Sequence, residues 1–292
     1  MSAEQDLREG CHAYITGTRT SYGYVPSTAA GIVFCILFSL STIIHLIQFG
    51  RSRIWWCGVF VIGGLVEIIG WAGRAWSSQC PYNSTAFLMQ ISTLIIAPVF
   101  FTAGVYIILG RLIQIFGRGS SILRPSLYLW IFCTCDTISL FVQAIGGGMV
   151  SAAVNKVNGN TDPGVNTMVA GVVFQLASMT VFVALAIDFL VRSTRRGMLR
   201  SGKQSSIPML SAMTLSLVCI YLRTIYRTIE LIQGWSGYLI SQEQYFIGLD
   251  GAMMVIAVGI FNFIHPASFL PRSSTEGTGE WLEIPQRAKT RQ

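Results

Sequence analysis

The stretch TAAGIVFCILFSLSTIIHLIQF, residues 28–49, contains no Asp, Glu, Lys or Arg. A helix rises 1.5 Å per residue, so a stretch of this length can cross a hydrocarbon core about 30 Å thick. Six further apolar stretches follow, at about residues 54–76, 87–110, 127–150, 166–191, 207–232 and 245–266. Each is continuous rather than alternating, which excludes a membrane β-barrel. The sequence therefore predicts an all-α membrane protein, a bundle of seven transmembrane helices.

Composition supports the membrane class. Of the 292 residues, 52% are hydrophobic and 11% charged, against about 25% charged residues in soluble domains. The net charge of +7 does not indicate nucleic-acid binding, because the basic residues lie in short breaks between apolar stretches and form no basic face with interleaved aromatics. No P-loop sequence is present and no lysine lies within a predicted helix, which argues against an ATP-driven pump and a retinal protein.

The distribution of basic residues predicts the orientation in the membrane. Of the 20 lysines and arginines, 14 lie in the C-terminal tail and in the loops after the first, third and fifth stretches. Positively charged loops remain in the cytoplasm, so the N-terminus is expected outside and the C-terminus inside. We therefore expect three regions: an outer segment at 1–27, a seven-helix domain at 28–268, and a disordered cytoplasmic tail at 269–292.

Two features of the predicted outer side concern covalent modification. Asn83-Ser84-Thr85 is the only N-x-S/T sequon, so Asn83 is a candidate glycosylation site. Cys11 and Cys80 both fall on this side, where an oxidising environment permits a disulfide between them. The other five cysteines lie in or beside predicted helices, and we interpret them as small apolar packing residues.

Several ionisable residues fall within the predicted helices. Each costs at least a few kcal/mol in the bilayer, so such groups pair, line water or serve a function. Arg223, Arg227 and Glu230 are three or four residues apart and share one face of the sixth stretch. Helical rise places them in the outer half of the membrane. The same level is predicted for Glu67, Arg74, Gln90, Gln143, Gln175 and Asp250.

Two interpretations of this outer polar cluster remain open. Glu67, Glu230 and Asp250 balance the three arginines Arg74, Arg223 and Arg227, as a low dielectric demands. The cluster is either a salt-bridge network that fixes helix packing or an outward-open cavity that binds the head group of an amphipathic ligand.

Asp136 lies near the predicted midplane and has no partner evident in the sequence. It is either a proton-coupling residue or a protonated, hydrogen-bonded aspartate. His45, His265 and Asp188 lie at inner helix ends, where an intramembrane hydrolase would hold a metal. No HxxxH or HExxH pair accompanies them, so no metal, cofactor or catalytic residue is expected.

The order of these motifs resembles the fungal RTA-like family, also called lipid-translocating exporters, over about residues 22–268. Trp71 departs from the resemblance, which leads us to expect Tyr at that position. The matching residues, in chain order, are Tyr24, Pro26, His45, Glu67, Gly70, Arg74, Gln90, Ala97, Pro98, Tyr106, Gly110, Arg111, Asp136, Ser139, Gln143, Gly146, Gly171, Gln175, Arg223, Arg227, Glu230, Tyr245, Asp250, His265 and Pro266.

The resemblance implies a multi-pass protein of a fungal membrane, with the plasma membrane favoured over an endomembrane. It implies export or movement of lipids or amphiphiles, such as sphingoid bases, phospholipids or toxic sterol-like compounds, and resistance to them. The alternatives are a seven-helix lipid sensor that does not transport and the metal-dependent lipid hydrolase described above. The expected partners are membrane lipids or amphipathic small molecules, and the oligomeric state is not indicated. The candidate translocation residues are Glu67, Arg74, Gln90, Asp136, Gln143, Gln175, Arg223, Arg227, Glu230 and Asp250.

Overall fold

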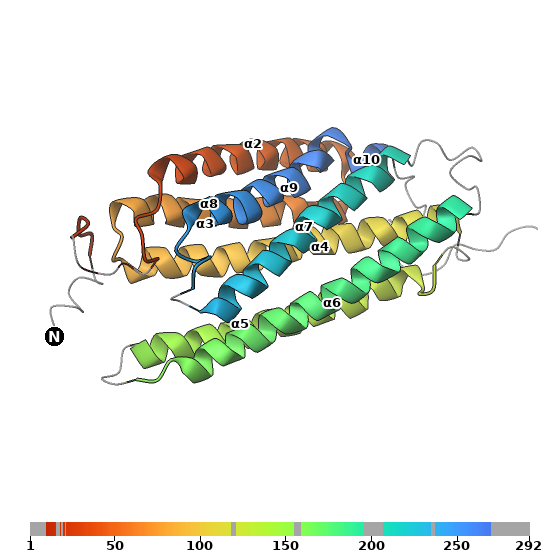
Figure 1. Cartoon of the computed structure of the whole chain (residues 1–292). Coiled ribbons are helices and arrows are strands. Elements are labelled where there is room, and N and C mark those ends of the chain that lie inside the picture. Colours follow the sequence, from red (N-terminus) through yellow and green to blue (C-terminus); the bar gives the residue numbers. More distant parts are fainter. Residues whose placement is uncertain are drawn as a thin grey trace, which may run out of the picture.

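A computed structural model describes residues 10–15, 18, 20, 22–117, 121–154, 159–195, 207–234 and 237–269. Seven of its helical segments are long and apolar enough to cross a membrane, and they form one bundle (Figure 1). The predicted all-α, seven-helix fold is therefore confirmed. The predicted cytoplasmic tail lies outside the described residues, except for Phe269.

The first six spans are nearly continuous helices. Their bounds are α2 Thr28–Ser52, α3 Gly58–Gln79, α4 Ser84–Phe116, α5 Pro125–Val154, α6 Asp162–Arg195 and α7 Ile207–Gln233. A short 3-10 turn, Trp55–Cys57, leads into α3. The seventh span is composite and comprises α8 Glu243–Tyr245, the π-helix η4 Phe246–Ala252 and α9 Met253–Phe263, with the short α10 Pro266–Phe269 behind it.

Capping residues determine where several helices begin and end, and α4 runs beyond its apolar stretch at both ends. The side chain of Ser27 accepts a hydrogen bond from the Ala30 nitrogen and begins α2. Asn83 does the same for α4 through the Ala86 nitrogen, before the apolar stretch starts. At the other end of α4, Gly117 has a φ of 97°, which glycine adopts without strain. Capping residues set the two ends of a helix, whereas hydropathy indicates only the part of the helix that lies in the hydrocarbon core.

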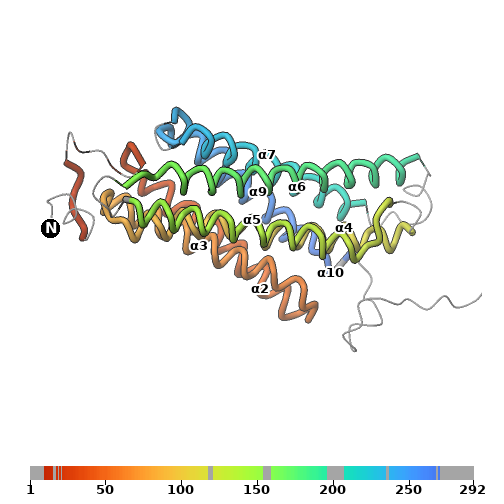
Figure 2. Tube along the Cα trace, turned by 90° about the horizontal axis from the view of Figure 1, so that it is seen from below, coloured from red at the N-terminus to blue at the C-terminus, as the bar shows by residue number. Residues whose placement is uncertain are grey.

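The spans pack in two groups that meet directly between α4 and α5 and also through α7. Helices α2, α3 and α4 lie side by side, and α5 and α6 form a long pair (Figure 1 and Figure 2). Helix α7 crosses diagonally between the groups and packs against α9, α6 and α4. Glycines bring α5 and α6 together, because a Cβ on Gly146 would lie 2.6 Å from the backbone nitrogen of Met168. Small residues let membrane helices approach closely in this way.

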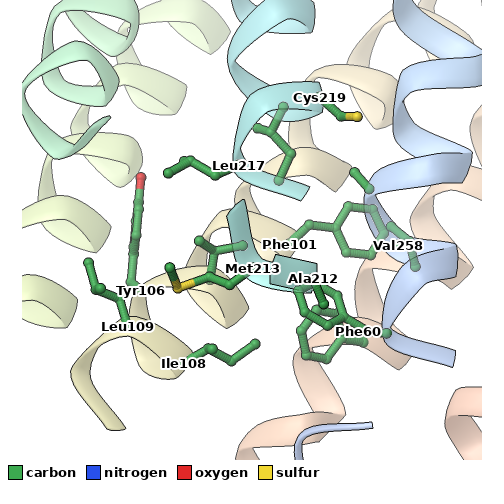
Figure 3. Close-up of a cluster of buried hydrophobic side chains, with 14 of the residues drawn as sticks. Phe60, Phe101, Tyr106, Ile108, Leu109, Ala212, Met213, Leu217, Cys219 and Val258 are labelled. Carbon is green, nitrogen blue, oxygen red and sulfur yellow. The ribbon is translucent and has the colours of Figure 1, made fainter. Parts of the chain in front are cut away.

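The apolar core lies where α3, α4, α7 and α9 meet. Phe60, Phe101, Met213 and Val258 come from these four helices and are nearly inaccessible (Figure 3). The outward faces are also apolar, with exposed Ile36, Leu40 and Ile43 on α2, Phe141 on α5 and Val181 on α6. Such an apolar surface would cause aggregation in water, and it is expected to face lipid chains.

Candidate functional site

Residues 10–27, as far as they are described, cover one end of the bundle. We call it the N-terminal end; it also contains the start of α2, the turn between α3 and α4, and the residues that join α7 to α8. A disulfide joins Cys11 to Cys80 at the end of α3. The Asn83 side chain donates to the Gly10 carbonyl at 3.1 Å. A glycan on Asn83 Nδ2 would leave one N–H for this bond, so glycosylation there stays a prediction.

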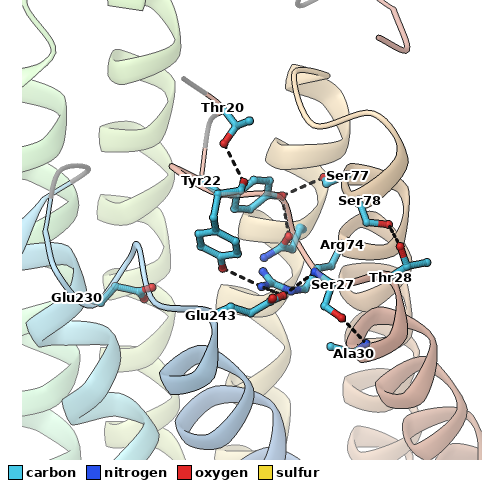
Figure 4. A network of polar contacts seen from close by, with 12 residues as sticks. Thr20, Tyr22, Ser27, Thr28, Ala30, Arg74, Ser77, Ser78, Glu230 and Glu243 are labelled. Atoms are coloured by element: carbon cyan, nitrogen blue, oxygen red, sulfur yellow. Dashed lines mark hydrogen bonds and ion pairs between the residues drawn. The ribbon is translucent and has the colours of Figure 1, made fainter. Parts of the chain in front are cut away.

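Two tyrosines of this segment contact side chains of the spans, and Figure 4 shows the position of Tyr22. The Tyr22 hydroxyl donates to Gln90 Oε1 of α4 at 2.7 Å and lies 2.9 Å from the Ser77 hydroxyl of α3. The Tyr24 hydroxyl accepts from Arg74 Nη2 at 2.8 Å. Burial raises the pKa of both tyrosines above the ordinary value, so their hydroxyls stay protonated and neutral. They act as hydrogen-bonding groups rather than as charges.

Arg74 is paired with Glu243, a residue that no pattern in the sequence singles out. Arg74 Nη2 lies 2.7 Å from Glu243 Oε1, and the Arg74 residue is 1% exposed. Its guanidinium also lies 4.3 Å from the centre of the Phe246 ring. The same Glu243 oxygen accepts from the Ser27 nitrogen at 2.8 Å, so one carboxylate ties α8 to both α2 and α3 (Figure 4).

The charged face of α7 meets the π-helix. Arg223 Nε lies 2.9 Å from Asp250 Oδ1, and Arg227 Nε lies 3.5 Å from the same oxygen. Arg227 Nη1 contacts Glu230 Oε2 at 2.7 Å within one turn of α7. Arg223 also donates to the Leu94 carbonyl of α4. All four charged side chains are buried, so the structure brings these four predicted site residues together.

Glu67 differs from Glu230 and Asp250 in its contacts. It is 1% exposed, and it takes part in none of the ion pairs between described residues. Its Oε1 has no hydrogen-bond partner among the described residues. The sequence analysis balanced the positive charges of Arg74, Arg223 and Arg227 with the negative charges of three acids, Glu67, Glu230 and Asp250. In the structure Glu243 of α8, and not Glu67, is the ion-pair partner of Arg74.

The remaining candidates lie deeper along α4, α5 and α6. Asp136 Oδ2 accepts hydrogen bonds from the Tyr106 hydroxyl at 3.0 Å and from the Thr102 hydroxyl at 3.1 Å. Gln143 of α5 donates to Gln175 of α6 at 3.0 Å. These contacts do not join the arginine cluster directly. The polar groups therefore form neighbouring clusters, and their common level in the membrane stays a prediction.

Two adjoining cavities connect the clusters. The first opens at the N-terminal end between α4, α6 and α7, and its lining includes Tyr22, Tyr24, Arg74, Gln90, Arg227 and Glu230. The second lies deeper, and its lining includes Asp136, Gln143, Gln175, Arg223 and Arg227. Arg227 and Leu231 line both.

The free volumes of the two cavities are about 50 Å³ and 30 Å³, which is room for a few water molecules. Glu67 and Asp250 are the two predicted site residues that line neither cavity.

Aromatic side chains pack beside Asp136. The Tyr106 and Phe182 ring centres lie 4.4 Å apart, and Phe132 packs 5.1 Å from Phe182. All three rings are nearly inaccessible. In this conformation the deeper cavity adjoins the first cavity, and the ring cluster packs beside Asp136, which the Tyr106 hydroxyl contacts.

The inner-end residues that a metal would need do not form a ligand cluster. Asp188 pairs with Arg192 at 2.8 Å, and His45 Nε2 lies 3.4 Å from the Val258 carbonyl oxygen. His265 Nδ1 accepts from the Ala267 nitrogen. Among the described residues, no three His, Cys, Asp or Glu side chains converge as a metal site would require.

Known proteins resemble this chain over most of its length. A sphingoid long-chain base transporter, RSB1, of Saccharomyces cerevisiae (strain ATCC 204508 / S288c) is 33% identical over 288 residues, covering 87% of this chain and 75% of the relative. Protoporphyrin uptake protein 1 of the same strain is 30% identical over 278 residues, covering 82% and 90%. Protein RTA1 of that strain is 26% identical over 272 residues, covering 84% of each.

No solved structure matches the chain. The relatives whose names state an activity are named for transport or uptake and not as enzymes, and together with the seven spans they identify a multi-pass membrane protein of a transport family. The model of the family described as RTA1 like protein matches residues 60–273. The chain therefore belongs to the RTA1-like family.

Proposed function

We propose that this protein moves amphipathic small molecules across its membrane and takes their polar head groups into the first cavity. The observation that carries the proposal is a buried route of two adjoining cavities, in which polar side chains lie among apolar ones, from the N-terminal end through Arg227 to Asp136. The route is lined by eight of the ten candidate residues. Because its free volume admits only a few waters, the apolar tail of a ligand would stay between helices, against lipid.

The charges of the first cavity suit a head group of either sign. Arg74 and Arg227 can attract carboxylates or phosphates, and Glu230 can attract an amine. The relatives are named for a long-chain base, which is cationic near neutral pH, and for a porphyrin that carries carboxylates. A cavity with paired charges fits such a range, since a ligand of either sign can displace one partner. Sphingoid bases are the substrate class that we favour.

The orientation and location belong to the same proposal. The excess of lysine and arginine in the loops after α2, α4 and α6 and in the C-terminal tail supports an N-terminal end outside the cytoplasm. The disulfide between Cys11 and Cys80 fits that side, because disulfides persist in oxidising surroundings. We propose the plasma membrane as the site of action and export as the direction, with resistance to toxic amphiphiles as the consequence.

Reconstitution into vesicles tests the proposal. Purified protein should speed the crossing of a fluorescent long-chain base over the rate in protein-free vesicles. The double variant Arg227→Gln/Glu230→Gln removes both charges of a pair without leaving one unpaired, and it should abolish this increase. Asp188→Asn/Arg192→Gln removes a half-exposed pair outside both cavities and should leave it unchanged.

A saturable binding signal without any crossing would instead identify a sensor. Unchanged crossing in the Arg227/Glu230 variant would refute the assignment of the first cavity. Melting temperature and the amount of protein in the vesicles are measured for each variant, so that loss of folding is recognised.

A further inference from the structure

Asp136 differs from the other buried acids around the cavities. Glu230, Glu243 and Asp250 each contact an arginine, whereas Asp136 contacts two hydroxyl groups. It is 2% exposed, and it forms no ion pair among the described residues. A carboxyl group in the bilayer interior that lacks a cationic partner takes up a proton, or it holds its charge at a cost of several kcal/mol.

The groups that face Asp136 come from all the elements packed around it. Helix α4 contributes the Tyr106 and Thr102 hydroxyls, and Cys133 lies one turn away on α5 itself. Helix α6 contributes the uncharged Gln175 and Met179 to the same cavity. Helix α7 contributes Arg223 and Arg227, which are already held by Asp250 and Glu230. Asp136 is thus the one acid lining this cavity, and the arginines beside it have other partners.

The cavities give access to Asp136 from one end. The cavity that it lines adjoins the first cavity at Arg227 and Leu231, which leads to the N-terminal end. Tyr106, Phe132 and Phe182 form the packed aromatic cluster beside it. A group that the cavities reach from one end, with packed rings beside it, can exchange with one compartment at a time, as a coupled carrier requires.

We propose that Asp136 is a proton site that couples substrate movement to proton movement in the opposite direction. This inference rests on the proposed transport function. A proton from the solution at the N-terminal end binds a carboxylate oxygen of Asp136 and leaves to the opposite side once the aromatic cluster opens. One proton enters for each cationic head group that leaves, so no net charge crosses. A gradient of one pH unit can then sustain about tenfold accumulation of a cationic substrate.

The test uses vesicles with an imposed pH gradient and a fluorescent N-trimethyl long-chain amine. Its fixed charge cannot carry a proton itself, so any proton that accompanies it is moved by the protein. Wild-type protein should drive the probe against its concentration gradient when the two sides differ in pH, and a pH dye inside the vesicles should report matching proton movement. Asp136→Asn should lose both effects, and its exchange of labelled for unlabelled probe at equal pH distinguishes a proton site from a substrate site. Asp188→Asn, a control on the far part of α6, should keep all three.

Each outcome decides the proposal. If wild-type protein moves the probe equally with and without a pH gradient, coupling is refuted while the transport function stands. If Asp136→Asn is still driven by the gradient, the assignment to Asp136 is wrong. If Asp136→Asn also loses exchange at equal pH although it is folded, Asp136 belongs to the substrate site instead. If the variant does not fold, the proton signal of the wild type decides, and its absence overturns the proposal. If wild-type protein moves no probe in any condition, both the proposed transport function and this inference are refuted.

Discussion

Replacing Glu243 by Gln should destabilise the bundle more than any change to an exposed charge. Arg74 is 1% exposed and its Nη2 lies 2.7 Å from Glu243 Oε1. The amide would leave the Arg74 guanidinium buried without a carboxylate, with the Tyr24 hydroxyl and the Phe246 ring among its remaining neighbours. Removing one partner of a buried pair costs about 3–5 kcal/mol. The Glu243 side chain is 20% exposed, which moves the expected cost to the lower end, about 3 kcal/mol.

A double-mutant cycle separates the charge effect from packing. Arg74→Met removes the guanidinium, so Glu243→Gln/Arg74→Met should be more stable than Glu243→Gln alone. Stability is measured in detergent by heating with a thiol-reactive dye, because Cys57 and Cys219 are buried and become reactive on unfolding. Arg192→Gln, which disrupts a half-exposed pair, serves as control and should cost less than about 1 kcal/mol. If Glu243→Gln melts with the wild type, or the second substitution restores nothing, the reasoning about an uncompensated charge is wrong.

Three further predictions are also tested by melting in detergent, and the reductant experiment is followed by tryptophan fluorescence because reductant reacts with a thiol dye. Gly146→Val should destabilise by about 1–3 kcal/mol, because its Cβ would meet backbone atoms of α6, whereas Gly148→Val, with nothing within 4 Å, should change little. Reductant should lower the melting temperature of wild-type protein, by about 2–4 kcal/mol in stability, and leave Cys11→Ser unaffected, since the disulfide spans 69 residues of sequence. Burial lowers the pKa of His265, so the unfolded chain takes up a proton that the folded protein resists, and stability should fall as pH drops through about 6.5. His265→Gln should reduce that fall, and an unchanged pH profile would contradict it.

The sequence predicts the seven spans because their signal is local. The length and hydropathy of a stretch such as residues 28–49 can be read from consecutive residues, without knowing what the stretch packs against. The charged face of α7 is predictable for the same reason, since Arg223, Arg227 and Glu230 are three or four residues apart and helix geometry fixes their side. Periodicity therefore reveals which face of a helix is polar, and it carries no information about what that face meets.

The partner of Arg74 could not be predicted in this way. Glu243 lies before an apolar stretch, where a charged residue is ordinary, and its role depends on the tertiary contact that brings α8 to α3. Tyr22 and Tyr24 are equally nonlocal, because they reach the bundle from the segment before α2. The resemblance named Tyr24 and gave it no partner. The count of charges in the sequence correctly gave three acids for three arginines. It included Glu67, whereas in the structure Glu243 pairs with Arg74.

The packing and cavity interpretations of the polar cluster describe one device. Arg227 and Glu230 lie on one turn of α7 and stay together however α7 moves, whereas Arg74–Glu243 and Arg223–Asp250 join different segments. An opening that draws α8 and η4 away from α3 and α7 must break both of these pairs. At about 3 kcal/mol for one broken pair, fewer than roughly one molecule in a hundred would open unaided. Under the proposed transport function, a charged head group that replaces a lost partner would remove that cost in the bound state alone. The ion pairs that hold the bundle closed would then make its opening depend on ligand.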